Sequence, residues 1–356
     1  MAFDRALAVV SALALAVAVA SPSSAQDKAQ EKSAEKTKLN KAEMAQYQSL
    51  HTLVDAVMAG KQRAPADFKL KFQNHFVKST RTVFVPYVLE ISAGKLSSFP
   101  VAMYVRAVRK STAAGAMTPA ETSKTPAPEK KAADYPFENI YFLADAKSLV
   151  STGPDTLELS RALDLAAGDY DVYIALAETP PRNAKDGPGK TALLTQPLTV
   201  PDYSTGLTTS TIILGKRMEA APRQLTAQQQ LEQPFTLGGY TITPTFSPAF
   251  PKTGEFLFVF IIYNEGVAST GKPDLSVDYS VFRAAEAKPF SKLATGVFNG
   301  TTLPAEFNLS AGHQVMVAQG FPLASFAPGD YKLEMKITDA TASMSIVRDV
   351  LFTVTP

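Results

Sequence analysis

The chain contains no cysteine and no tryptophan among its 356 residues, and it has only three histidines. The absence of cysteine excludes disulfides, thiolate catalysis, a metal held by cysteine and a lipid-modified N-terminal cysteine. The absence of tryptophan removes the strongest aromatic platform for binding a sugar. We therefore expect the fold to be stabilised by its hydrophobic core and not by cross-links.

Charge is also sparse and nearly balanced. Lysine and arginine together number 35 against 33 aspartates and glutamates, which leaves a net charge of +2. Recognition of nucleic acid normally requires a concentrated basic surface, so we expect no nucleic-acid partner. A hydrophobic content of 46% with 25 prolines is typical of a soluble β-rich protein.

Apolar runs are short, and the longest lies near the N-terminus. Arg5 precedes an apolar stretch over 6–20, and Ser23-Ser24-Ala25 ends in the pattern of small residues that signal peptidase accepts. This pattern predicts a signal peptide over 1–25 with cleavage after Ala25, and hence a periplasmic or secreted protein. The apolar stretch is shorter than the roughly 20 residues of a spanning helix, so no membrane span is expected after cleavage.

The segment that follows predicts a tether and then one amphipathic helix. Residues 26–39 are rich in alanine and alternating charge, which favours a solvated tether. Asn40 followed by Glu43 resembles a capping box, and Gly60 is a plausible stop, so a helix is expected over 40–60. One face of this helix is apolar and is formed by Tyr47, Leu50, Val54, Val57 and Met58.

Beyond residue 66 the hydrophobic period changes to two, which indicates short strands without intervening helices. One series of strands is expected over 67–215, with a non-periodic insertion at 110–134, and a second over 235–356. A linker with a short helical patch after Thr226 is expected over 216–234. This pattern predicts an all-β protein of two tandem immunoglobulin/fibronectin-III-like β-sandwiches, preceded by the signal peptide and the amphipathic helix.

The two series share a turn that supports a duplication. Gly168-Asp169-Tyr170 and Gly329-Asp330-Tyr331 each open a strand in which every second residue is apolar. A tight turn that delivers a tyrosine to the first inward position of a strand is typical of the tyrosine corner, in which the hydroxyl bonds back to the preceding loop. We therefore assign these six residues a structural role.

The first of these turns also carries a resemblance to a known family. Leu165-Ala166-Ala167-Gly168-Asp169-Tyr170, with the later Val200-Pro201-Asp202-Tyr203 and the run Leu207 to Leu214, resembles the β-rich C-terminal segments of secreted bacterial GWxTD-domain and von Willebrand A-related proteins. The resemblance implies an exported β-sandwich protein of the cell envelope. The GWxTD motif itself is absent, and the string from Asp274 to Asp278 departs from the metal motif of von Willebrand A domains, so metal-dependent adhesion is not carried over.

No motif of catalysis or cofactor binding is present. The three histidines, His51, His75 and His313, have no metal-ligand spacing, and no nucleophile elbow, Walker loop or dinucleotide fingerprint occurs. Asp274 and Asp278 share one strand face, but a solvated face explains them more simply than a calcium site does. We therefore expect no catalytic residue, no cofactor and no metal.

The most informative anomaly is apolar. In the strand predicted over 255–264, phenylalanines and isoleucine occupy one face, and Leu257, Val259, Ile261 and Tyr263 occupy the other. The strand over 83–91 is similar, so each strand needs a second cover. The sister domain, the helix over 40–59 and another protein are the candidates, and we favour a cover from within the chain. An interface with a partner would involve Leu50, Val54, Leu257, Val259, Ile261 and Tyr263.

These observations predict a non-catalytic binding or scaffolding protein of the bacterial envelope. Its expected partner is another envelope protein or a second copy of the chain. Three alternatives stay open: a carbohydrate-binding accessory module using tyrosines, a hydrolase whose site is assembled in space, and a protein that accepts a partner's strand. The last needs an unprotected edge strand; Pro86 and Pro100 indicate an interruption or an edge in their own strands.

Overall fold

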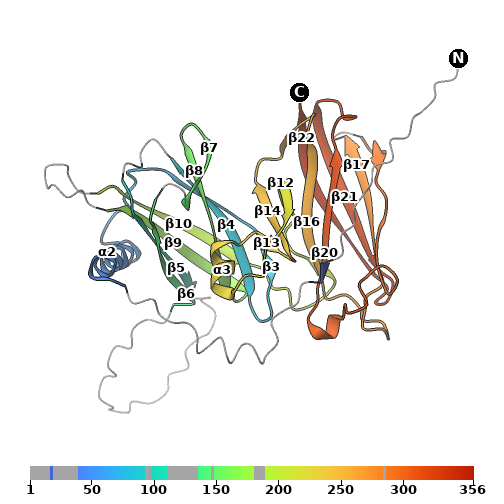
Figure 1. Cartoon of the computed structure of the whole chain (residues 1–356), viewed down its shortest axis with the longest axis horizontal. Coiled ribbons are helices and arrows are strands. Elements are labelled where there is room, and N and C mark those ends of the chain that lie inside the picture. Colours follow the sequence, from blue (N-terminus) through green and yellow to red (C-terminus); the bar gives the residue numbers. More distant parts are fainter. Residues whose placement is uncertain are drawn as a thin grey trace, which may run out of the picture.

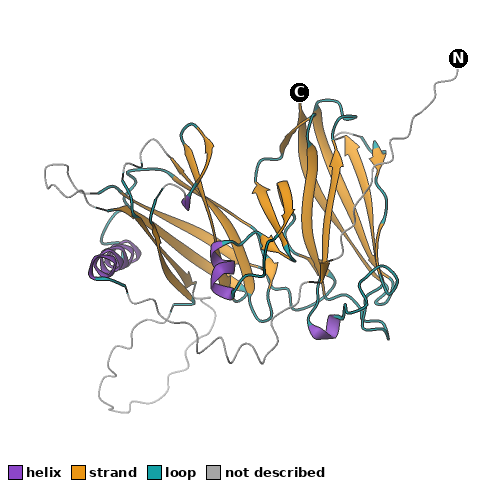
Figure 2. Ribbon diagram, in the orientation of Figure 1, coloured by secondary structure: helices purple, strands orange, loops and turns teal. Residues whose placement is uncertain are grey.

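The chain is mainly β. A computed structural model describes residues 39–92, 96, 98–110, 135–145, 148–179, 189–283 and 286–356, and the backbone of a short strand, β1 (Val17–Ala18). Apart from β1, the expected signal peptide, the tether up to residue 38 and the expected insertion from residue 111 onward lie outside the described residues. The described strands form four sheets (Figure 1, Figure 2).

The first half of the molecule holds two of these sheets around one core. Sheet I has the order β2-β4-β8-β7, with β3 also paired to β4, and sheet II has the order β10-β9-β5-β6. Their bounds are β2 Leu70–Asn74, β3 Val77–Lys78, β4 Val83–Ser92, β5 Val101–Arg109, β6 Phe137–Leu143, β7 Val150–Gly153, β8 Thr156–Leu165, β9 Gly168–Glu178 and β10 Thr191–Val200. Alternate residues of β4 and β9 meet in the shared core, as their period of two requires.

A single helix, α2 (Lys41–Met58), covers the outer face of sheet II (Figure 1). The expected capping box is confirmed, because the Asn40 side chain accepts from the backbone N–H of Glu43 and the Glu43 side chain accepts from the N–H of Asn40. Leu50 and Val54 are buried against small and aromatic side chains of the sheet. The apolar stripe of this helix is therefore covered within the chain.

The second half holds the other two sheets around a phenylalanine-rich core. Sheet III has the order β1-β20-β16-β12-β14-β13, with β11 also paired to β16, and sheet IV has the order β15-β22-β21-β17-β18, with β19 also paired to β17. Sheet III comprises, besides β1, the strands β11 Thr208–Thr209, β12 Ile213–Ala220, β13 Thr236–Leu237, β14 Tyr240–Thr245, β16 Glu255–Tyr263 and β20 Val315–Pro322. Sheet IV comprises β15 Ala249–Pro251, β17 Leu275–Arg283, β18 Ser291–Lys292, β19 Gly296–Phe298, β21 Gly329–Asp339 and β22 Met344–Thr355.

The two halves meet through the outer faces of sheets I and III, and we call this contact the junction. Val259, Ile261 and Tyr263 of β16 are buried there in one apolar cluster with Val77 and Val88 of the first half. A short helix, α3 (Ala227–Glu232), lies against β8 at the same contact. The order of layers is α2, sheet II, sheet I, sheet III and sheet IV (Figure 1). The second apolar face of β16 is thus covered by the other half of the chain.

The repeated turn forms the same contacts in both halves. The hydroxyl of Tyr170 donates to the carbonyl of Ala166 at 2.8 Å, and that of Tyr331 donates to the carbonyl of Ala327 at 2.8 Å. Gly168 and Gly329 have φ angles of 144° and 147°, which an L side chain rarely adopts. The next residue of each turn also matches, because the Asp169 carboxylate accepts from Thr199 and the Asp330 carboxylate accepts from Thr353.

The segment between the two series differs from the expectation. The strand expected over 207–214 in the first series forms β11 and the start of β12, and both pair with β16 of sheet III. Much of the expected linker 216–234 is also ordered, since β12 continues to Ala220 and α3 begins at Ala227 behind its N-cap Thr226. The reason is pairing, because β12 fills the position between β16 and β14 that no other strand occupies.

Candidate functional site

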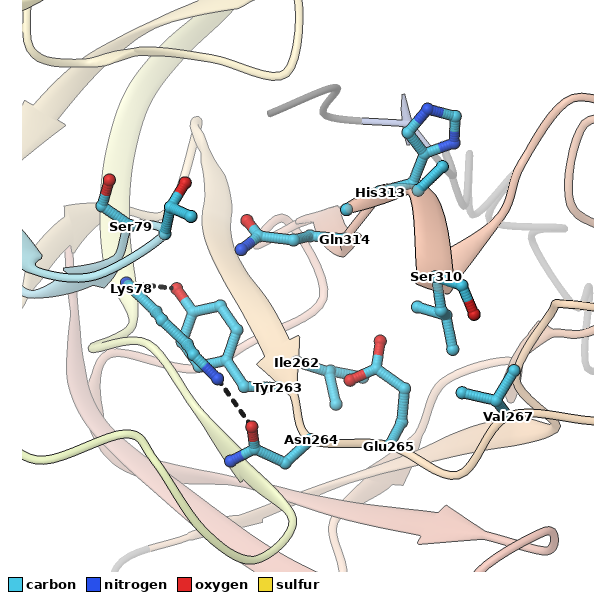
Figure 3. A pocket seen from close by; sticks show the side chains of 14 residues that line it. Lys78, Ser79, Ile262, Tyr263, Asn264, Glu265, Val267, Ser310, His313 and Gln314 are labelled. Carbon is cyan, nitrogen blue, oxygen red and sulfur yellow. Dashed lines mark hydrogen bonds between the residues drawn. The ribbon is translucent and has the colours of Figure 1, made fainter. Parts of the chain in front are cut away.

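The junction opens at one end into a hollow of about 500 Å³, which we call the junction pocket (Figure 3). Three segments line it: residues 78–80 at the end of β3, residues 262–265 with Val267 at the end of β16, and residues 309–314. The last segment includes the short 3-10 helix η4 (Leu309–Ala311) that precedes β20. Ligand sites occur preferentially between domains, so this hollow is the leading candidate for a small-molecule site.

Asn264 fixes the geometry of the junction pocket. Its φ of 61° lies in the left-handed region, which asparagine tolerates better than most residues. Its side-chain amide donates to the carbonyls of Tyr203 and Gly206 at 3.0 and 2.9 Å, and its Oδ1 accepts from Nζ of Lys78 at 2.6 Å. One side chain thus ties β3 and the segment before β11 to the end of β16.

Tyr263 also contacts Lys78 at the junction pocket. Its hydroxyl accepts from the backbone N–H of Lys78 at 2.9 Å, and Nζ of Lys78 lies 5.8 Å from the centre of its ring. Burial raises the pKa of Tyr263 well above its usual range, so the hydroxyl stays protonated at neutral pH. The ammonium group of Lys78 is consequently held between the Asn264 amide oxygen and an aromatic face.

Glu265 places a carboxyl group in the junction pocket (Figure 3). Burial raises the pKa of this carboxyl to about 7, and the neighbouring Asp339 acts in the same direction, while a hydrogen bond from the backbone of Glu265 itself and the charge of Lys78 oppose the shift. Asp339 is fully buried, and its carboxylate accepts the backbone N–H groups of Gly266 and Ala342 at 2.6 and 3.0 Å. A carboxyl poised near neutrality in a hollow is a frequent property of functional sites.

The chemistry of the junction pocket favours binding. Hydroxyls, two amides, an imidazole, an ammonium group and a carboxyl surround the hollow. His313 accepts from the backbone N–H of Asn308 through Nδ1, and among the described residues no hydroxyl of the pocket is hydrogen-bonded to it. The arrangement therefore offers donors and acceptors to a polar ligand, without a joined nucleophile and base.

A second hollow lies beside β22. This strand pairs with β21 along its whole length, but on its other side it pairs with β15 only at Thr353–Thr355. Next to residues 348–350 of this strand lies a hollow of about 640 Å³, which we call the edge groove. It is lined by residues 208–212 and 348–350 with Leu214, and by His75 and Tyr203 of the segments flanking β11 and β3.

Arg348 crosses the edge groove. Its guanidinium donates to the hydroxyls of Thr209 and Thr208, each at 3.1 Å, and to the carbonyl of Val347 at 3.1 Å. The neighbouring Val347 and Leu351 are 50% and 67% exposed on the outer face. The edge thus combines backbone groups, one bridging cation and isolated apolar side chains.

A third cluster of polar side chains lies between α2 and sheet II. Arg106 is fully buried and donates to the carboxylates of Asp55 and Glu138 and to the hydroxyl of Tyr104. His51 lies 3.2 Å from Asp55. Two carboxylates around one buried guanidinium compensate its charge, so the geometry accounts for this cluster as an attachment of the helix to the sheet.

The residues named from sequence as a possible partner interface lie in three places. Leu50 and Val54 contact sheet II, and Val259, Ile261 and Tyr263 lie in the junction. Leu257 is half-buried and pairs with Gly215 on one side and Gly320 on the other, so its side chain lies over two glycines. These residues do not form one surface.

Sequence reasoning did not find the junction pocket. Lys78 and Asn264 are separated by 186 residues, so their contact leaves no local spacing to detect. The only available signal is the Asn-Glu-Gly run that ends an otherwise apolar strand. Within the described residues no group of three or more histidine, cysteine, aspartate or glutamate side chains is placed to hold a metal ion. No helix in that part of the chain is long and apolar enough to cross a membrane.

Comparisons with known proteins add no relative. No family model matches the chain, and no curated protein matches it. The resemblance to GWxTD-domain and von Willebrand A-related proteins therefore rests on the turn motifs around Gly168 and Pro201 and on the run Leu207 to Leu214 alone and stays a prediction.

Proposed function

We propose that the chain is an exported, non-catalytic binding or scaffolding protein of the bacterial cell envelope, built on two tandem immunoglobulin/fibronectin-III-like sandwiches. It binds an extended segment of another envelope protein, which adds as a strand to the edge of β22. The export assignment rests on the charge and apolar pattern of residues 1–25.

The open edge of β22 carries this proposal. The N–H of Thr353 donates to the carbonyl of Pro248, so it points away from β21, toward the side on which β15 lies. Because direction alternates along a strand, the groups of Leu351, Asp349, Val347 and Ser345 point to the same side. Beyond β15 no described strand pairs with them. A partner strand would satisfy them as in other complexes formed by strand addition.

The edge groove offers contacts to the side chains of such a partner strand. A strand beside β22 would place alternate side chains on the outer face, next to Val347 and Leu351, and the others in the groove, next to Leu214 and Val350. The hydroxyls of residues 208–211 supply polar contacts on the far wall. This alternation favours a partner segment with apolar residues at every second position.

Arg348 protects the open edge of β22 against unspecific strand pairing. Charged side chains on edge strands oppose unspecific pairing, and this guanidinium spans the groove. A partner must displace the contacts of Arg348 with Thr208, Thr209 and the carbonyl of Val347. The two threonine contacts are partly buried hydrogen bonds from a charged donor and contribute roughly 1.5 to 3 kcal/mol each, so the partner strand must offset their loss with several backbone hydrogen bonds and with apolar contacts.

The test uses the lack of native cysteine. We would introduce Asp349→Cys at the edge and, as a matched control on the outer face of sheet IV, Ser280→Cys, and attach a photo-crosslinker to each full-length protein in its own cell envelope. The proposal expects one partner cross-linked through position 349, absent from position 280. It also expects loss of that partner in an added Val347→Pro variant, because proline removes an N–H that points to the edge and not to β21.

Three outcomes would contradict the proposal. Equal cross-linking from positions 349 and 280 would show unspecific contact. Absence of any product at position 349 would show that the edge binds nothing. A product containing only a second copy of this chain would replace the envelope partner by self-association.

A further inference from the structure

Glu265 is a half-buried carboxyl with no ion pair among the described residues. It points into the junction pocket, and the side chain of Gln314 lies on the other side of the hollow (Figure 3). A charged carboxylate in this position loses hydration, and a cation in the pocket would restore the lost stabilisation.

The groups around Glu265 leave that position open to a cation. The ammonium group of Lys78 is held 2.6 Å from Oδ1 of Asn264. Asp339 lies behind Glu265, and its carboxylate is occupied by two backbone N–H groups. The other titratable side chains that line the pocket are Tyr263, whose hydroxyl accepts from the N–H of Lys78, and His313, which bonds to Asn308. The local field around Glu265 therefore contains one fixed cation and one fixed anion.

The rim of the junction pocket is partly apolar. Val267 is 49% exposed, and Leu309 also lines the pocket. The hydroxyls of Ser79, Thr80 and Ser310 line other parts of the same hollow. An aliphatic chain would contact the two apolar side chains on its way to the carboxyl, and its attached polar groups would meet the hydroxyls.

We propose that the junction pocket binds a primary ammonium group on an aliphatic stem, as in a lysine side chain, with Glu265 as its ion-pair partner. Val267 and Leu309 contact the stem. The site goes beyond strand addition at β22, because none of its residues lines the edge groove. Failure of either proposal leaves the other standing.

The binding should depend on pH in a defined direction. Burial raises the pKa of Glu265 to about 7, and a lysine ammonium stays charged to about pH 10. Ionised Glu265 is therefore the binding-competent form, and its fraction rises about tenfold between pH 6 and pH 8. Affinity should rise by about the same factor, with no further gain above pH 8.

The experiment titrates the full-length protein with N-acetyl-lysine methylamide and follows binding by NMR. N-acetyl-norleucine methylamide, which has the same stem without the ammonium group, is the control ligand. Wild type should bind the lysine probe at least tenfold more tightly than the norleucine probe. Glu265→Gln keeps the shape of the protonated carboxyl and should abolish this preference, whereas Glu286→Gln, a carboxylate outside the pocket, should retain it.

A second variant tests the role of the fixed cation. Lys78→Met removes the neighbouring positive charge, so binding of the lysine probe should strengthen several-fold when measured at about pH 9, where Glu265 is ionised with or without Lys78. Equal affinity for the two probes, an unchanged preference in Glu265→Gln, or affinity that is flat between pH 6 and pH 8 would each overturn the proposal. Cross-linking at position 349 is measured without these probes, so the two tests fail independently.

Discussion

The outer faces of sheets III and IV belong to the same half of the molecule but differ in composition and cover. On sheet III, Val259, Ile261 and Tyr263 follow one another on a face without charge and are buried in the junction. On sheet IV, Val347 and Leu351 are exposed, and each pairs with a lysine of β21. An unbroken apolar face thus marks internal cover, whereas apolar side chains interleaved with charge mark a surface that the described chain leaves free.

The largest expected effect comes from placing a charge on the covered face. Val259→Lys or Ile261→Lys would bury an ammonium group without a partner, so each should lower the free energy of unfolding by about 4 kcal/mol or more. The matched change on the free face, Val347→Lys, should alter it by less than about 0.5 kcal/mol. Chemical denaturation of the three variants measures both. Similar values on the two faces would break the comparison.

The helix-covered face of sheet II extends the comparison to the first half. Leu50→Ala removes a buried side chain between α2 and sheet II, and we expect a loss of about 2 to 5 kcal/mol. Leu351→Ala, on the free face, should cost less than about 0.5 kcal/mol. Thermal melting of the two variants provides the test, and an unchanged melting temperature for Leu50→Ala would mean that the helix does not cover the sheet in solution.

His75 sharpens the comparison through pH. Its ring is buried at the junction, stacked 4.7 Å from Phe246 and edge-on to Phe235, and burial lowers its pKa to about 4. Between pH 6.5 and pH 4 the unfolded histidine binds a proton that the folded one does not, so stability falls as the pH decreases. The loss should reach about 3 kcal/mol near pH 4 and is fully absent above pH 6.5.

The His75→Phe variant isolates that contribution. It replaces the ring by one that cannot be protonated, so the difference in unfolding free energy between pH 7 and pH 4 should shrink by the amount that His75 supplies. Denaturant titrations at the two pH values, on both proteins, give this difference directly. Parallel pH profiles would show that His75 does not titrate through the junction.

The smallest effect is expected at the two tyrosine corners, where the halves do not differ. Tyr170→Phe and Tyr331→Phe each remove one hydroxyl that donates to a loop carbonyl, and each should cost about 1 kcal/mol. The double variant should cost their sum, because the corners lie in separate cores. Unequal single losses would indicate that only one corner holds its half together.

Local patterns predicted much of the fold. The period of two located most strands, Asn40 and Glu43 located the start of α2, and the two-sided apolar pattern of β16 indicated the junction. The interruption predicted at Pro86 also has a structural explanation. Pro86 lies on β4 between the segment paired to β2 and the segment paired to β3, where the hydrogen-bond ladder is interrupted and a missing N–H costs little.

The candidate sites were not predictable because they depend on which strands become neighbours. The junction pocket brings together Lys78 and Asn264, which are 186 residues apart in the sequence. The edge groove brings together Thr208 and Arg348, which are 140 residues apart. Alternation along a strand tells which side chains share a face, but it does not tell which backbone side lacks a partner. The free edge of β22 is therefore visible only in the sheet order.

The position of β12 also determines how this protein can be divided or exchanged. A fragment that begins at residue 235 would lack the strand between β16 and β14 and would leave two strand edges of sheet III exposed at once. A fragment that ends at residue 215 would carry β11 and the first residues of β12 without the strands they pair with. The second half therefore needs the chain from before Leu207 onward in order to fold. Recombination between such proteins would keep each strand with its partners only if the crossover lay upstream of that residue.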